Sequence, residues 1–396
     1  MAHFACKGAN PCPHRVKCLP GNPRIKTIAM QTGLTPALTV LLGGFLLAFV
    51  FGLVASRSNF CIMGAVSDAV NMQHFGRMRL WLLALAVALL GTNLLQLAGL
   101  IDLGKSLYHR PGVPWLSLLL GGTVFGVGMT LAGGCPNKNL LRLGGGSLRS
   151  FVVLVFLAIT AYMTLKGLFA PVRVFYLDPV AVDLSTLGLP QATLAALLSR
   201  MTGVPATTAL ISTTACCTLA LLAWVFKDRE FRSEPAQLVS GIVLGLLVTA
   251  GWYLTGHLGY GESPETLETV YFATNSRTLE SFSFVAPMAY GLEMLLLWTD
   301  KSLRLTFGIV SVIGVALGAF AQARSSGHFR WEGFASLQDL RQNLAGAMLM
   351  GFGGVTAMGC TIGQGLSGLS SLAIGSLIAV GGIVAGSAAT MKWLAR

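Results

Sequence analysis

Residues 126–147 read GVGMTLAGGCPNKNLLRLGGGS, and residues 351–371 read GFGGVTAMGCTIGQGLSGLSS. When Cys135 is placed on Cys360, an offset of 225 positions, small residues coincide before the cysteine and a leucine coincides after it. The coinciding pairs are Gly121/Gly346, Gly126/Gly351, Gly128/Gly353, Ala132/Ala357, Gly134/Gly359 and Leu141/Leu366. Each copy is an apolar stretch, a Gly-Cys break and a short glycine-rich stretch. We therefore expect two equivalent interrupted helices.

Such a break matters most inside a membrane. Its backbone N–H and C=O groups lose their helical partners, and lipid cannot replace them. The break must then face protein or a water-filled cavity. Breaks at matching places in two repeats indicate the binding site of a transporter.

The composition indicates that lipid surrounds the chain. Of 396 residues, 54% are hydrophobic and 11% are charged, and the mean hydropathy is +0.71. Soluble proteins carry roughly 25% charged residues. The net charge of +12 then reflects which loops face the cytoplasm. No basic-aromatic recognition motif is present, so we expect a lipid bilayer, and no nucleic acid, as partner.

Nine stretches approach the roughly 20 apolar residues that a spanning helix needs. They are 36–55, 80–101, 115–132, 150–169, 207–226, 237–257, 302–323, 342–358 and 372–391. Shorter apolar pieces begin near Phe60, Cys135, Phe282 and Cys360 and predict half-helices. Both halves follow the same order, and the lone span at 207–226 inverts the second half. The predicted fold class is an all-α polytopic membrane protein with inverted repeats, about nine spanning helices and four short half-helices.

The same order predicts four parts of the chain. They are a polar, cysteine-bearing tail (1–33), a first membrane repeat (34–170), a linker with one span (171–236) and a second, inverted repeat (237–396). Ser58–Cys61 corresponds to Glu280–Ser283 at an offset of 222, so Ser283 takes the place of Cys61. The tail has no apolar core of 7–15 residues and is not a secretory signal. Loop charges favour an outside N-terminus, although the basic tail argues the other way.

Three cysteines, Cys61, Cys135 and Cys360, each stand beside a predicted helix break. One interpretation is that they are small apolar fillers. The other is that they line a substrate path. A thiol offers a weak S–H donor and a polarizable sulfur, which suits a soft, sulfur-bearing solute. Burial in apolar surroundings keeps a thiol neutral, so it can bond to an anion without repelling it.

Other residues near the breaks could assist an anion. The helix N-termini after Cys135 and Cys360 present unpaired N–H groups and a positive dipole end. The neutral candidates for the path are Asn137, Asn139, Thr361 and Gln364. Lys138 and Arg142 either attract the anion at a mouth or snorkel to the membrane interface.

Three charged side chains near the breaks could serve the structure and not transport. Glu293 lies within an apolar run, where it is either a proton-coupling group or a packed residue bonded within the bundle. Arg57 and Asp68 flank Cys61, and we expect them to form an ion pair.

Enzyme and metal signatures are missing. The sequence contains no Walker P-loop and no Cys-x-x-Cys pair. The tail cysteines Cys6, Cys12 and Cys18 have a spacing that matches no common zinc pattern. We expect neither metal nor cofactor, and no catalytic residue. Cys216 and Cys217 are expected to serve packing.

These residues carry a resemblance to the YeeE/YedE family of bacterial sulphur-compound transporters. The matching blocks are SRSNFCIMG (56–64), GGCP (133–136), MGFGG (350–354) and GCTIG (359–363). The resemblance covers roughly residues 34–395. It implies an hourglass-shaped inner-membrane protein that takes up thiosulfate, with three cysteines like Cys61, Cys135 and Cys360 passing the anion by S–H···S contacts. It also implies, for some relatives, a cytoplasmic sulfur-carrier partner. The tail and the residues Pro136–Lys138 depart from the family pattern.

The leading hypothesis is therefore an inner-membrane permease, not an enzyme, for thiosulfate or a related inorganic sulfur anion. Two alternatives stay open. A membrane sulfur-transfer or redox protein would form a cysteine persulfide, which needs a reactive thiolate. A sensor would use the tail to report sulfur status to a partner.

Overall fold

The computed structural model describes residues 35–262, 268–334 and 336–395. The chain divides into two units, Met1–Thr35 and Pro36–Arg396, and the second unit contains the membrane bundle. Cys6, Cys12 and Cys18 lie outside the described residues, so the expectations about the tail stay predictions.

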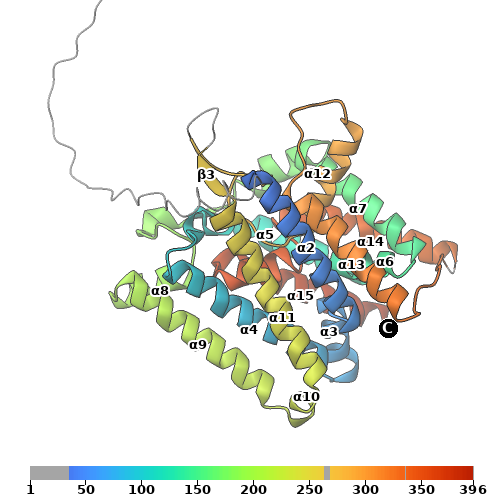
Figure 1. The fold of residues 1–396 in the computed structure, drawn as a ribbon, viewed down its shortest axis with the longest axis horizontal. Coiled ribbons are helices and arrows are strands. Elements are labelled where there is room, and N and C mark those ends of the chain that lie inside the picture. The colour runs from blue at the N-terminus through green and yellow to red at the C-terminus, as the bar shows by residue number, and fades with distance from the viewer. Residues whose placement is uncertain (1–34, 263–267, 335, 396) are drawn as a thin grey trace, which may run out of the picture. The chain divides into compact units, whose positions relative to one another are not determined.

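The second unit is a helical bundle (Figure 1). Within the described residues, eight helical segments are long and apolar enough to cross a membrane. They are α2 (Pro36–Arg57) with α3 (Ile62–Ser67) and η1 (Asp68–Met72), α4 (Gly76–Leu97), α5 (Trp115–Leu131) with α6 (Pro136–Gly144), α7 (Leu148–Lys166), α9 (Ala206–Phe226), α11 (Pro235–Tyr253) with η6 (Leu254–Leu258), α13 (Phe307–Ser325) and α15 (Ile374–Leu394). The predicted all-α polytopic membrane fold is confirmed.

The remaining stretch that the sequence predicts as a span forms α14 (Leu337–Thr356). Its 20 residues are long enough for a span, but its first turns contain Asp339 and Arg341 and lower its mean hydropathy. These charges lie at the end of the bundle, and the glycine-rich remainder of α14 is buried between other helices.

Short helices follow each predicted break. α3 with η1 and α6 follow the first two breaks, while α12 (Val285–Leu296) and the π-helix η7 (Gly363–Gly368) follow the last two. The prediction of four half-helices is therefore confirmed.

The connections carry little regular structure. Short antiparallel pairs join β1 (Gly112–Val113) to β2 (Val182–Asp183), and β3 (Tyr260–Glu262) to β4 (Thr269–Tyr271). Single turns form η2 (Leu103–Lys105), η3 (Leu107–His109), η4 (Val172–Leu177) and η5 (Leu184–Leu187). α8 (Leu194–Thr202) and α10 (Arg229–Arg232) flank α9, which lies at the edge of the bundle beside α4 (Figure 1).

Glycines let α5 and α14 pack with their backbones in contact. A Cβ added at Gly121 would lie 2.5 Å from the backbone nitrogen of Ala357. A Cβ added at Gly346 would lie 2.5 Å from the backbone nitrogen of Ala132. These two contacts exchange under the 225-residue offset, which is what a two-fold axis between inverted repeats produces. The helices run antiparallel, and only residues without a side chain allow this approach.

The other helix pairs repeat the same relation. α2 packs along α13 as α4 packs along α11, and α5 packs along α15 as α7 packs along α14 (Figure 1). α9 joins the two halves and has no counterpart in this scheme. The residue boundaries of the two repeats stay a prediction.

Candidate functional site

Cys61 caps the first half-helix. The chain leaves α2, turns at Asn59 with a φ of +51°, and extends through Cys61. The Cys61 sulfur accepts a hydrogen bond from the backbone N–H of Gly64, at 3.4 Å. Phe60 is buried and packs edge-on against Phe51, with ring centroids 6.3 Å apart. A positive φ and a large anchored ring thus hold the thiol beside the break.

Cys135 begins the second half-helix. Gly133 reverses the chain with a φ of +64°, and the N–H of Gly134 bonds to the carbonyl of Met129 at 2.9 Å. Pro136 occupies the first helical turn, where a missing N–H costs nothing. The Cys135 thiol faces the Cys61 thiol in a side-chain contact.

Cys360 repeats the geometry of both. Met358 reverses the chain at the end of α14 with a φ of +55°, and the N–H of Gly359 bonds to the carbonyl of Gly354 at 2.9 Å. The Cys360 sulfur accepts from the N–H of Gly363 at 3.5 Å, as Cys61 does from the residue three positions on.

The two Gly-Cys breaks meet. α5 and α14 are antiparallel, and the loops at their C-terminal ends both turn back toward the middle. As a result, the side chain of Thr361 lies beside the Cys135 thiol. Cys135 and Cys360 are each 1% exposed or less, so both thiols are inside the bundle. The structure thus brings all three predicted cysteines into one series: Cys61, Cys135, then Thr361 with Cys360.

Two hydroxyls approach the far end of this series. A Cβ added at Gly363 would lie 2.7 Å from Ser283 Oγ and 3.5 Å from Tyr108 Oη. Ser283 thus stands by the Cys360 break as Cys61 stands by Cys135, in agreement with its predicted place. The residue that corresponds to Gly363 in the first repeat is Lys138, so the two ends of the series differ in charge.

Two of the predicted amide residues, Asn139 and Gln364, bond to the backbone of the breaks. Asn139 donates to the carbonyls of Gly134 and Cys135 at 2.9 and 3.2 Å. Gln364, at the corresponding position, donates to the carbonyl of Ala357 at 2.6 Å. The carbonyls of Gly134 and Ala357 are groups that the breaks leave without helical partners, and these amides satisfy them. Their donors are therefore occupied by the backbone.

Other buried groups near the breaks have unused hydrogen-bonding capacity. Asn137 donates weakly to the carbonyl of Phe60, at 3.5 Å, and its Oδ1 has no partner in the described structure. Thr361 Oγ1 and Trp81 Nε1 also lack a hydrogen-bond partner there. The Trp81 ring packs on Gly365 of η7. Unpaired buried polar groups are costly, so they mark places where a solute or water would bind.

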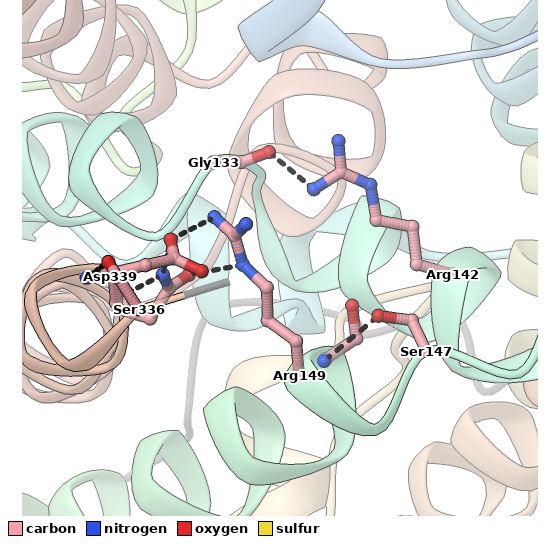
Figure 2. A network of polar contacts seen from close by, with 8 residues as sticks. Gly133, Arg142, Ser147, Arg149, Ser336 and Asp339 are labelled. Carbon is pink, nitrogen blue, oxygen red and sulfur yellow. Dashed lines mark hydrogen bonds and ion pairs between the residues drawn. The ribbon is translucent and has the colours of Figure 1, made fainter. Parts of the chain in front are cut away.

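Lys138 lies at the Cys61 end of the series. Its ammonium donates to Asn59 Oδ1 at 3.4 Å and lies near enough to Cys61 and Cys135 to interact electrostatically. Arg142 lies further out and donates from Nη1 to the carbonyl of Gly133 at 2.9 Å (Figure 2). Lys138 therefore adds a cation next to the thiols, and Arg142 fastens the reversing loop before Cys135.

Arg149 completes this end of the bundle and was not predicted. Its Nη2 pairs with Asp339 Oδ1 at 3.2 Å, and its Nε donates to Asn343 Oδ1 at 3.1 Å (Figure 2). It ties the start of α7 to the start of α14. We call this end, with Lys138, Arg142 and Arg149, the Lys138 end.

The predicted carboxylates have cation partners. Glu293 is buried on α12, and its Oε1 accepts from Lys166 Nζ at 2.6 Å. A proton-coupling role for Glu293 stays a prediction. Asp68 pairs with Arg77 at 3.3 Å, so the expectation that it pairs with Arg57 is wrong. Arg77 lies in the first turn of α4 and is brought to Asp68 by the turn that follows η1.

Sequence reasoning missed Tyr108 and Trp81. Tyr108 lies in a connection and Trp81 in an ordinary apolar span, so neither stands beside a break in sequence. Within the described residues no three His, Cys, Asp or Glu side chains are grouped as metal ligands would be. Cys216 is exposed and Cys217 half-buried on α9.

An apolar helical bundle whose two interrupted helices meet at buried thiols and unpaired donors is a multi-pass membrane transport protein of the inverted-repeat type. Residues 57–389 match the family described as Sulphur transport, and the chain belongs to this family. The YeeE/YedE resemblance is thereby confirmed.

Two relatives have curated names. The chain is 25% identical over 354 residues to a thiosulfate transporter TsuA of Escherichia coli (strain K12), covering 83% of this chain and 87% of the relative. It is 26% identical over 364 residues to a thiosulfate transporter TsuA of Spirochaeta thermophila, covering 89% of this chain and 98% of the relative.

Proposed function

We propose that this chain is an inner-membrane permease for thiosulfate or a related inorganic sulfur anion. The observation that carries the proposal is the series of Cys61, Cys135 and Cys360 at breaks that meet inside the bundle. The names of the two relatives support thiosulfate as the substrate. A cytoplasmic sulfur-carrier partner stays a prediction.

The thiols suit the terminal sulfur of such an anion. Each neutral S–H is a weak donor, and a polarizable sulfur is a good contact for another sulfur. Weak contacts at several adjacent places hold an anion without trapping it, which conduction requires. The anion passes between Cys360, Cys135 and Cys61 while its S–S bond stays intact.

The polar groups around the thiols support the anion's oxygens. Within the described residues, Trp81 Nε1 and Thr361 Oγ1, which lies beside the Cys135 thiol, are buried donors without a hydrogen-bond partner, and Asn137 Nδ2 makes one weak bond at 3.5 Å. Nine residues of α6 direct the positive end of their dipole toward Cys135. Lys138 adds a full positive charge at one end. Asn139 and Gln364 contribute indirectly, because their amides hold the backbone of the breaks in place.

The test is uptake of labelled thiosulfate by the full-length protein in proteoliposomes, with each of the three cysteines changed to Ala and, separately, to Ser. We expect each Ala variant to lose most uptake and the Ser variants to retain part of it, because a hydroxyl still donates a hydrogen bond. Wild-type uptake in all three Ala variants would overturn the relay.

The same proteoliposome preparations distinguish transport from the rival hypothesis of a sulfur-transfer protein that forms a cysteine persulfide. In persulfide chemistry a cysteine thiolate attacks the outer sulfur of thiosulfate, the S–S bond of thiosulfate breaks and sulfite leaves. The cysteine then carries one added sulfur atom, which intact-protein mass spectrometry detects. We expect no added mass during turnover. A stable adduct on one of the three thiols, with all uptake lost in its Ser variant, would favour sulfur transfer.

A further inference from the structure

A cavity of about 250 Å³ opens at the other end of the bundle from Lys138. It lies where α5 begins and α14 ends, and Tyr108, Arg110, Arg173, Asp178, Met358 and Gln364 are among its lining residues. α5 has 17 residues, so about 26 Å of helix separates this end from the Lys138 end. A site for one water needs only about 10–15 Å³, so the cavity has room for a small anion together with several waters.

Only one of the two arginines in this cavity is neutralised by a described residue. Arg173 pairs with Asp178, with Nε and Oδ2 3.6 Å apart, and Ser117 also donates to that carboxylate at 2.7 Å. Arg110 is exposed at the rim and forms no ion pair with any carboxylate in the described part of the chain. The cavity therefore has an available guanidinium at its opening, and guanidinium groups bind oxyanions through paired N–H donors.

Tyr108 separates this cavity from the cysteine series. Its ring packs edge-on against Trp252, with centroids 6.2 Å apart, and its hydroxyl points at Gly363 beside Ser283. Burial raises the pKa of the Tyr108 phenol above its ordinary value, so the hydroxyl keeps its proton and can donate. The next residue, His109, is buried and bonds through Nε2 to the carbonyl of Ser371 at 2.9 Å, which fixes the position of the turn.

We propose that this cavity is a capture site for small tetrahedral dianions, where Arg110 holds the anion and the Tyr108 hydroxyl passes it to Ser283 and Cys360. The proposal rests on the permease function proposed above. None of the described cysteines lines the cavity, so the capture site selects for charge and size and the thiols beyond it select for sulfur. Sulfate should therefore bind at the cavity, compete with thiosulfate and not be carried.

The first experiment measures binding without transport. Isothermal titration with thiosulfate and with sulfate is made on the full-length protein carrying Cys135→Ala. We expect both anions to bind with similar Kd, and Arg110→Gln to raise both Kd values about tenfold, as for loss of a hydrogen bond to a charged group. Lys105→Gln is the matched control, because Lys105 is an exposed cation of the neighbouring turn and does not line the cavity. An unchanged Kd in Arg110→Gln, or thiosulfate binding without sulfate binding, would overturn the capture site.

The second experiment measures the transfer step. Tyr108→Phe keeps the ring against Trp252 and removes the donor. We expect its Kd for sulfate to stay within about twofold and its maximal thiosulfate uptake to fall about fivefold, the effect of one neutral hydrogen bond. Unchanged uptake would refute the role of the hydroxyl. If the cysteine variants transport normally while Arg110→Gln loses binding, the relay fails and the capture site stands.

Discussion

Gly363 is the position where a single methyl group should close the path. It is buried between the Cys360 thiol and the Ser283 and Tyr108 hydroxyls. In Gly363→Ala the new Cβ would lie 2.7 Å from Ser283 Oγ, where an ordinary carbon–oxygen contact is about 3.4 Å. Ser283 would then have to move by about 0.7 Å toward the path. Overpacking of this kind costs about 1–3 kcal/mol.

We expect this overpacking free energy to add to the activation barrier for passage of the anion, and so to slow transport. Since about 1.36 kcal/mol corresponds to a factor of ten, thiosulfate uptake should fall about 5- to 150-fold. Uptake is measured in proteoliposomes, and the thermal midpoint of the purified protein is recorded in parallel. Wild-type uptake by a folded Gly363→Ala protein would refute the placement of Gly363 on the path.

Two further variants separate blockage from misfolding. Gly381→Ala is the matched control, because a Cβ there meets nothing within 4 Å on the exposed face of α15. It should transport normally and be slightly more stable, since alanine favours a helix over glycine. Adding Ser283→Gly to Gly363→Ala removes the clashing side chain and should restore part of the uptake. Failure of this rescue would place the blockage elsewhere.

Three other perturbations follow from the described contacts. Burial lowers the pKa of His109 to about 4, against the bond to Ser371 and the charge of Asp102, so the folded state resists its protonation. The lowered pKa of His109 makes the free energy of unfolding depend on pH. The contribution of neutral His109, up to about 3 kcal/mol, is fully present above pH 6.5 and is lost as the pH falls through about 4. His109→Asn should flatten the fall of the thermal midpoint between these pH values, and an unchanged slope would contradict the assignment. Lys166→Met leaves the Glu293 carboxylate buried without its partner and should cost about 2 kcal/mol in a denaturant titration, since Lys166 itself is half exposed. Lys138→Gln should reduce thiosulfate uptake about fivefold relative to the wild type at low ionic strength, and by a smaller factor at high salt. The same fold reduction at both salt concentrations would argue against an electrostatic role.

Much of the framework could be predicted because it depends on local properties. The apolar spans follow from their hydropathy, and the breaks follow from glycines that permit chain reversal, as at Gly133. The repeated Gly-Cys motif was sufficient to predict that Cys135 and Cys360 occupy equivalent places. The offset of 222 also predicted that Ser283 takes the position of Cys61, and the contacts around Gly363 agree.

The partners of individual side chains could not be predicted in the same way. Arg57 and Arg77 lie at similar distances from Asp68 in sequence, on opposite sides of it, and it is the turn after η1 that brings Arg77 to the carboxylate. Asn139 and Gln364 are polar residues beside the breaks, yet their amides are consumed by backbone carbonyls. Which side-chain donor stays available depends on which backbone carbonyls lie within its reach after the chain reverses, and this cannot be predicted from the sequence.

The sequence by itself determined that this chain is an interrupted, duplicated helical membrane protein with cysteines at its breaks, because hydropathy and glycine content act residue by residue. Only the tertiary structure decided that the breaks meet, because this requires two antiparallel helices to pack closely and their end loops to turn back. The same packing brought Tyr108 from a connection to Gly363, and left Lys138 at one end of the thiols and Arg110 at the other.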